Sequence, residues 1–130
     1  MPEVVLRPAE EEDIAEMLAL YAPYVVQTTV SSEYDAPSME EFTRRWRTYT
    51  QKLPWLVCRI DGEVVGYAMN SVYVADWEPQ GFSEGWTDRI GVRPGWRARG
   101  IGPALLQASM RSFRDAGLQG AGLGVDTEHP

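Results

Sequence analysis

The chain reads Arg97-Ala98-Arg99-Gly100-Ile101-Gly102-Pro103-Ala104-Leu105-Leu106 at the point where a short apolar strand gives way to an amphipathic helix. The two glycines let backbone N–H groups approach an anion without interference from a Cβ atom. The unpaired N–H groups and the positive dipole end of the new helix favour negative charge at the same place. Arg97 and Arg99 add full positive charges. The stretch therefore predicts a phosphate-binding turn; the alternative is a solvated, arginine-rich loop.

Residues before this turn extend the pattern. Arg97, Gly100 and Gly102 occupy, in order, the positions of an Arg/Gln-x-x-Gly-x-Gly/Ala signature, and Ile90-Gly91-Val92 precedes them. In this context the chain resembles the GCN5-related N-acetyltransferase (GNAT) superfamily, whose signature binds acyl-CoA. The resemblance implies acetyl-CoA as cosubstrate, without a metal. It assigns cofactor contacts to Ile90, Gly91, Val92, Arg97, Ala98, Arg99, Gly100, Ile101, Gly102 and His129.

The N-terminal half resembles one branch of this superfamily. Segments 6–14, 21–25, 28–30, 55–57 and 61–68 look like the phosphinothricin-type enzymes, which acetylate a small amino-acid-like amine. From residue 85 onward, segments 85–92 and 121–128 look more like another, less defined acetyltransferase branch. The superfamily resemblance covers nearly the whole chain.

Hydrophobic periodicity and turn residues predict a mixed α/β fold. We expect strands at 4–7, 55–60, 63–74, 86–92 and 120–125, and helices at 13–22, 39–51 and 100–116, the last mostly buried. Asp61-Gly62 is typical of a type I′ hairpin turn, Ser38 and Glu41 form a capping box, and 75–84 is expected to be a loop. The resemblance implies the GNAT fold, with a mostly antiparallel sheet whose strands 86–92 and 120–125 splay apart.

Composition limits the class of protein. With 130 residues and 44% hydrophobic content we expect a single domain, 1–130, and no apolar run approaches the ~18 residues that cross a bilayer. The formal net charge of −7 argues against nonspecific nucleic-acid binding. Cys58 and His129 are single residues of their types, so an intramolecular disulfide is excluded and a His/Cys metal site is not expected. We predict a cytoplasmic protein that binds neither nucleic acid nor membrane.

Acetyl transfer to an amine requires a neutral amine, stabilisation of an oxyanion and a proton for the thiolate. Histone acetyltransferases of the superfamily place their base four residues before the position of Val92, which assigns the role of base to Asp88. The phosphinothricin-type enzymes place a glutamate where this chain has Thr87. By resemblance the Val92 N–H stabilises the oxyanion. The alternative for Asp88 is a surface charge pair with Arg89 or Arg93.

The acceptor is expected to be the primary amine of a small molecule. Its candidate binding residues lie on the first predicted helix, on the loop that follows it, and at the start of the strand 86–92; they are Tyr21, Tyr24, Thr28, Thr29 and Trp86, joined by Tyr67. For each aromatic residue the alternative is packing in the core or a loop.

Relatives of this superfamily continue past the position of His129 into a further helix, whose tyrosine protonates the thiolate, and into two more strands. The resemblance therefore implies that the C-terminal part of the fold is missing from these 130 residues. An exposed sheet edge favours pairing with another chain, so we expect a homodimer or an aggregation-prone chain. The alternative function is a weakly active or inactive domain that binds acyl-CoA or a partner subunit.

Overall fold

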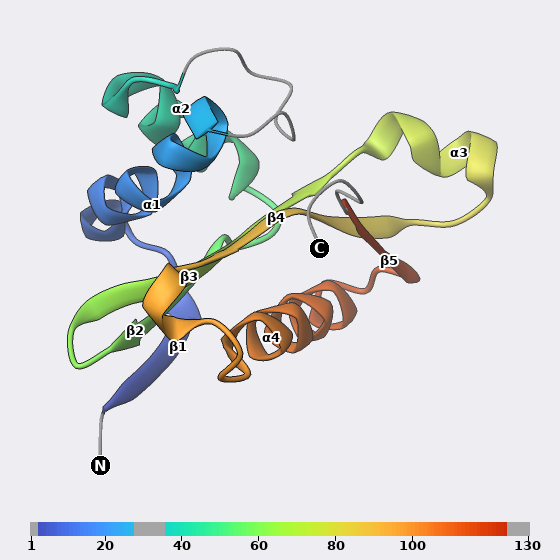
Figure 1. Ribbon diagram of the computed structural model, residues 1–130. Coiled ribbons are helices and arrows are strands. Elements are labelled where there is room, and N and C mark those ends of the chain that lie inside the picture. Colours follow the sequence, from blue (N-terminus) through green and yellow to red (C-terminus); the bar gives the residue numbers. More distant parts are fainter. Residues whose placement is uncertain (1–2, 28–35, 125–130) are drawn as a thin grey trace.

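The computed structural model describes residues 3–27 and 36–124, which form a five-stranded sheet in the order β1-β2-β3-β4-β5 (Figure 1). The strands are β1 (Val4–Pro8), β2 (Leu56–Ile60), β3 (Glu63–Val72), β4 (Glu84–Val92) and β5 (Gly120–Leu123). Neighbouring strands are antiparallel except β4 and β5, which are parallel. The predicted mixed, mostly antiparallel sheet is therefore confirmed.

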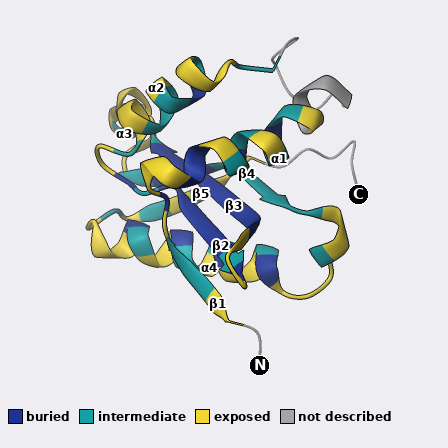
Figure 2. Ribbon diagram, turned by 90° about the vertical axis from the view of Figure 1, so that its left-hand side faces the viewer, coloured by how far each residue is buried: buried dark blue, intermediate teal, exposed yellow. Residues whose placement is uncertain are grey.

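Helices cover both faces of the sheet (Figure 1). α1 (Ile14–Gln27) and α2 (Met39–Tyr49) lie over one face, and α4 (Ile101–Asp115) lies over the other. α3 (Trp77–Gln80) stands at the end of the arm formed by β3 and β4. Burial is greatest on β2 and β3, in the middle of the sheet (Figure 2).

Side chains of β2 alternate between the two faces, as a strand requires. Val57 joins the core under α1 and α2, whereas Leu56, Cys58 and Ile60 join the core over α4. Cys58 is buried, and burial raises the pKa of its thiol. One core thus joins the sheet to α1 and α2, and the other joins the sheet to α4.

Three expectations about local structure are wrong. α1 runs through Pro23 to Gln27, five residues beyond the predicted end, although Pro23 has no N–H for an intrahelical bond. The segment 75–84, predicted as a loop, contains α3, which ends at Gly81 in the left-handed conformation (φ 86). α4 buries only the stripe Ile101, Leu105, Ser109 and Phe113. It does so because a helix packed on one sheet face leaves its other side in solvent.

Candidate active site

The turn between β4 and α4 presents unpaired backbone donors. Ala98 (φ 63) and Gly100 (φ 84) adopt the left-handed conformation, and Gly100 is the N-cap of α4. Within the described residues, the N–H groups of Gly100, Ile101 and Gly102 donate to no protein acceptor. A Cβ atom at Gly100 would meet nothing within 4 Å, and one at Gly102 would meet only Val92 Cγ2, at 3.9 Å. The turn is therefore open, and its donors are suited to an anion.

Two of the predicted arginines stay at this turn. Arg97 donates from Nε to the Val92 carbonyl at 3.2 Å, and the Arg99 guanidinium lies 5.0 Å from the centroid of the Trp96 ring. Arg93 turns away: it pairs with Glu63 at 3.0 Å and donates to the Val64 carbonyl. Arg93 thus binds β3 instead of Asp88.

The edge of β4 opens after its first half. Its parallel pairing with β5 runs from Glu84 opposite Gly120 to Thr87 opposite Leu123, and the Gly124 N–H then donates to the Thr87 carbonyl at 3.0 Å. No strand in the described part of the chain pairs with this edge beyond that point. The two strands therefore part at Asp88.

The orientation of the open edge follows from its pairing with β3. The Arg93 N–H donates to the Val65 carbonyl at 2.8 Å, and Val92 and Ile90 stand opposite Gly66 and Ala68. Bonded and non-bonded pairs alternate in an antiparallel ladder. Ile90 and Val92 therefore direct their N–H and C=O groups away from β3, toward the open edge.

Asp88 is the extra residue of a β-bulge. Met69 stands opposite Arg89 and Asn70 opposite Thr87, so Asp88 has no partner on β3. Its carboxylate accepts hydrogen bonds from the Ser71 hydroxyl on Oδ2 and from the Tyr73 phenol on Oδ1.

The aromatic rings of Tyr73 and Trp86 meet edge to face beside Asp88, with centroids 6.4 Å apart and an interplanar angle of 74°. Partial burial and the bond to Asp88 raise the pKa of the Tyr73 phenol, so it remains a donor at neutral pH. Asp88 and Trp86 are candidates from the sequence, whereas Ser71 and Tyr73 are not among the residues predicted there. Ser71 lies near the end of β3 and Tyr73 directly follows that strand, and this spacing of two residues was the signal available in the sequence.

Thr87, next to Asp88, faces the other side of the sheet. Its hydroxyl donates to Asn70 Oδ1 at 2.7 Å, and Asn70 Nδ2 donates to Ser109 Oγ at 3.0 Å and to the Pro54 carbonyl at 2.9 Å. Thr87, Asn70 and Ser109 are fully buried. The position where the phosphinothricin-type enzymes carry a glutamate therefore belongs to a closed polar network under α4.

The predicted acceptor residues fall into three groups. Trp86 lies at Asp88, as described above. Tyr21 is buried and stacks on Phe42, with ring centroids 5.7 Å apart, and Tyr67 is buried in the same core. The side chains of Tyr24, Thr28 and Thr29, like the predicted cofactor residue His129, lie outside the described part of the structure.

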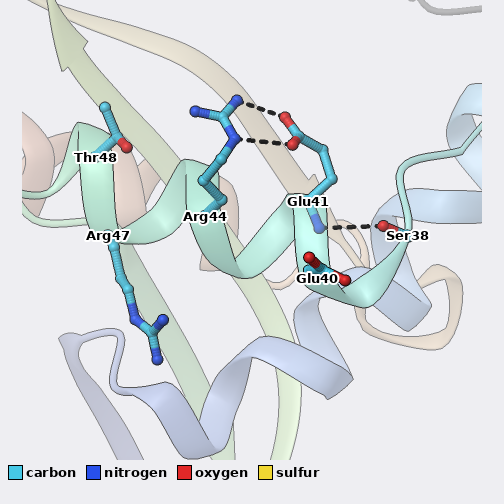
Figure 3. A pocket seen from close by; sticks show the side chains of 6 residues that line it. All are labelled: Ser38, Glu40, Glu41, Arg44, Arg47 and Thr48. Atoms are coloured by element: carbon cyan, nitrogen blue, oxygen red, sulfur yellow. Dashed lines mark hydrogen bonds and ion pairs between the residues drawn. The ribbon is translucent and has the colours of Figure 1, made fainter.

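A separate hollow of about 600 Å³ lies along α2, lined by Ser38, Glu40, Glu41, Arg44, Arg47 and Thr48 (Figure 3). Ser38 accepts from the Glu41 N–H at 3.1 Å, which confirms Ser38 as the N-cap of α2. The other half of the predicted capping box is wrong, because the Glu41 carboxylate binds Arg44 and Arg45 instead of the Ser38 N–H. The Arg44 guanidinium lowers the pKa of Glu41 to about 2, and Arg47 pairs with Glu11. These charged groups are thus engaged within the protein.

The described residues contain no group of three or more His, Cys, Asp or Glu side chains that could hold a metal ion. None of the helices in this part of the chain has the length and apolar character needed to span a membrane.

The comparisons with known proteins agree with this architecture. The Acetyltransferase (GNAT) family profile matches residues 13–130, and the chain belongs to this family. Aminoglycoside N(6′)-acetyltransferase type 1 of Stenotrophomonas maltophilia is 43% identical over 70 residues, which are 50% of this chain and 43% of that protein. The match thus spans less than half the length of this curated relative.

Solved structures show the same fold. An N-acetyltransferase from Staphylococcus aureus Mu50 superposes with a TM-score of 0.85 at 23% identity, over 98% of this chain and 76% of that one. A phosphinothricin acetyltransferase from Sinorhizobium meliloti, in complex with acetyl-CoA, has a TM-score of 0.73 at 27% identity, over 85% and 60% of the two chains. The predicted superfamily and fold are confirmed.

Proposed function

We propose that the protein is an N-acetyltransferase that transfers the acetyl group of acetyl-CoA to the primary amine of a small molecule. The observation that carries the proposal is the open turn at Gly100–Gly102, whose unpaired N–H groups lie next to the open edge of β4. Membership of the GNAT family supports it, as do two similar structures solved with acetyl-CoA: the phosphinothricin acetyltransferase above and a putative acetyltransferase from Salmonella typhimurium.

The residues present fit such a cofactor. The N–H groups of residues 100–102, with Arg97 and Arg99, would hold the pyrophosphate, because both donors and charge converge there. The outward N–H and C=O groups of Ile90 and the C=O group of Val92 would bind the pantetheine amides as a neighbouring strand would. His129 is proposed as a further contact. Acetyl-CoA supplies a thioester, a carbonyl activated toward nucleophiles.

Direct transfer assigns a role to each of three residues of the chain. Asp88 takes a proton from the ammonium group of the acceptor, directly or through a water, which frees the nitrogen lone pair. The Val92 N–H, directed to the open edge, would donate to the oxyanion that forms when nitrogen attacks the carbonyl. Collapse of this intermediate would break the C–S bond, and the CoA thiolate would take up the second proton that the nitrogen loses. Trp86 forms a wall of the acceptor site beside Asp88.

A pair of variants at Gly102 tests the cofactor site. A side chain fits there, because a Cβ atom would meet only Val92 Cγ2. Gly102→Asp brings negative charge to the anion site and should weaken CoA at least ~10-fold in calorimetry, about 1.4 kcal/mol. Gly102→Asn has nearly the same size without the charge and should cost clearly less. Equal affinities for Gly102→Asp and the parent would remove the turn from the cofactor site.

A thiol-release assay separates transfer from binding alone. Turnover with one of a panel of amino acids, polyamines and aminoglycosides supports the transferase. CoA binding without thiol release supports the alternative, a binding domain with weak or no activity. Homodimer formation is proposed as well and is tested by sedimentation. A cytoplasmic location and a lack of nucleic-acid or membrane partners stay predictions.

A further inference from the structure

We propose that Ser71 and Tyr73 are positioning residues that orient the Asp88 carboxylate for proton transfer; this inference rests on the proposed function. The two hydroxyls bind different oxygens of one carboxylate, Ser71 at Oδ2 and Tyr73 at Oδ1. A carboxylate held at both oxygens cannot rotate about its terminal bond. One remaining lone pair on each oxygen points in a fixed direction, ready to accept a proton.

The bulge makes such support necessary. Asp88 has no partner on β3, so the strand pairing does not determine its orientation. From the opposite face, Thr87 is tied through Asn70 to Ser109 on α4. This buried network therefore fixes the backbone at Thr87, directly before Asp88. Ser71 and Tyr73 fix the Asp88 side chain.

Tyr73 is itself held although its side chain is exposed. Its ring meets the Trp86 indole edge to face, and Trp86 lies directly on Gly122 of β5, where a Cβ atom would come within 1.9 Å of the indole. A series of contacts, from Gly122 to Trp86, from Trp86 to Tyr73 and from Tyr73 to Asp88, thus connects β5 to the candidate base. A larger residue at 122 would displace the Trp86 indole, the first side chain in this series of contacts.

The kind of donor matters for the chemistry. Ser71 and Tyr73 are neutral, so they orient Asp88 without cancelling its negative charge. An arginine in their place would form a salt bridge and compensate that charge. Neutral hydroxyls leave a charged, oriented carboxylate that attracts an ammonium ion and can accept its proton.

Turnover of single and double variants tests this inference. Tyr73→Phe and Ser71→Ala should each lower kcat about 10-fold with the parent KM for acetyl-CoA, because loss of orientation costs rate without affecting the cofactor turn. Ser71→Thr keeps a hydroxyl and should restore most of the rate. In an Asp88→Asn background Tyr73→Phe should have no further effect, since the two residues act as one unit.

A matched control makes one of these substitutions elsewhere. The Ser112 hydroxyl donates to the Ser109 carbonyl within its own helix, away from Asp88. Ser112→Ala should keep the parent kcat.

A titration provides a readout that needs no turnover. The groups that act on the Tyr73 phenol are Asp88, Ser71 and Tyr49. The ultraviolet titration of Tyr73, obtained by subtracting the Tyr73→Phe spectrum, should move to lower pH in Asp88→Asn, because the carboxylate that holds the phenol proton is gone. An unchanged titration would show that the Tyr73–Asp88 bond is absent in solution, which overturns the proposal.

The outcomes separate this inference from the proposed function. If Asp88→Asn keeps the parent kcat, Asp88 is not the base, and Ser71 and Tyr73 have no positioning role. A low kcat in Asp88→Asn with parent rates in Tyr73→Phe and Ser71→Ala overturns the positioning role alone. An equal loss from Tyr73→Phe with and without the Asp88 carboxylate does the same, since Tyr73 would then act independently.

Discussion

Gly91 of β4 lies against the ring of Tyr67 on β3, its partner in the strand register. A Cβ atom on Gly91 would come within 2.4 Å of the phenol ring. Tyr67 is buried in the core beneath α1, so its ring has little room to move away. A side chain at Gly91 must therefore displace β4 at the edge that we assign to the cofactor.

Gly91→Ala should weaken CoA binding about 10-fold in calorimetry and lower the free energy of unfolding by about 1–3 kcal/mol, because the extra methyl overpacks the site. Gly95→Ala is the control: it changes a glycine near the same turn whose Cβ atom would meet nothing within 4 Å. If Gly91→Ala behaves like Gly95→Ala in both measurements, Tyr67 does not constrain this edge.

Thr87→Val tests the buried network under α4. Valine fills nearly the same space but leaves Asn70 Oδ1, which is fully buried, without its donor at 2.7 Å. We expect a loss of about 1–3 kcal/mol in the free energy of unfolding by urea, with an unchanged m value. Thr43→Val, on the surface of α2, removes a hydroxyl bonded within its own helix and should change little. If Thr87→Val lowered the free energy of unfolding as little as Thr43→Val does, water would be reaching Asn70.

Asp13 links α1 to the first two strands. Its carboxylate is fully buried and accepts hydrogen bonds from Arg7 at 2.6 Å, from Arg59 at 2.7 Å and from the Glu10 N–H at 2.7 Å. Burial alone would raise the pKa of Asp13, but the bonds from Arg7, the Glu10 N–H and Arg59 outweigh it and lower the pKa.

The lowered pKa of Asp13 determines the sign of a pH effect. Below about pH 4 the unfolded chain takes up this proton before the folded chain does, so the contribution of Asp13 is present above that pH and is lost as pH falls through the folded pKa. Asp13→Asn should cost about 3 kcal/mol at neutral pH and flatten the acid side of the stability curve. The exposed Asp115 provides the control, Asp115→Asn. If the stability of Asp13→Asn fell as steeply with acid pH as that of the parent, the fall would be caused by other carboxyl groups.

Gly122→Ala should act on the acceptor without acting on the cofactor turn. The new methyl cannot coexist with the present position of the Trp86 indole, 1.9 Å away, so Trp86 must move from Asp88. We expect KM for the amine to rise several-fold and the tryptophan fluorescence to change, while the affinity for CoA stays that of the parent. Gly95→Ala again serves as the control. If Gly122→Ala keeps the parent KM for the amine while its fluorescence shifts, Trp86 moves but does not form part of the acceptor site.

Features with short-range causes were predictable from the sequence. The Asp61-Gly62 turn, with φ values of 51° and 82°, and the Ser38 cap depend on residues within a few positions of one another. The signature at 97–102 likewise predicted the turn with Gly100 at the start of α4, because glycine spacing and helix onset are local. The continuation of α1 past Pro23 was not predictable in this way, since proline lowers local helix propensity and the surrounding structure overrides it.

The surroundings of Asp88 were decided only by the tertiary structure. Its two donors lie 17 and 15 residues away in sequence, and they reach it because β3 and β4 form a hairpin. Thr87 and Asp88 are neighbours in the chain, yet one enters a buried network under α4 and the other the open site. Side chains on a strand alternate between faces, and the bulge at Asp88 shifts that alternation by one residue. A local sequence pattern contains both residues but not the register that separates them, because the register is set by the pairing of the whole hairpin.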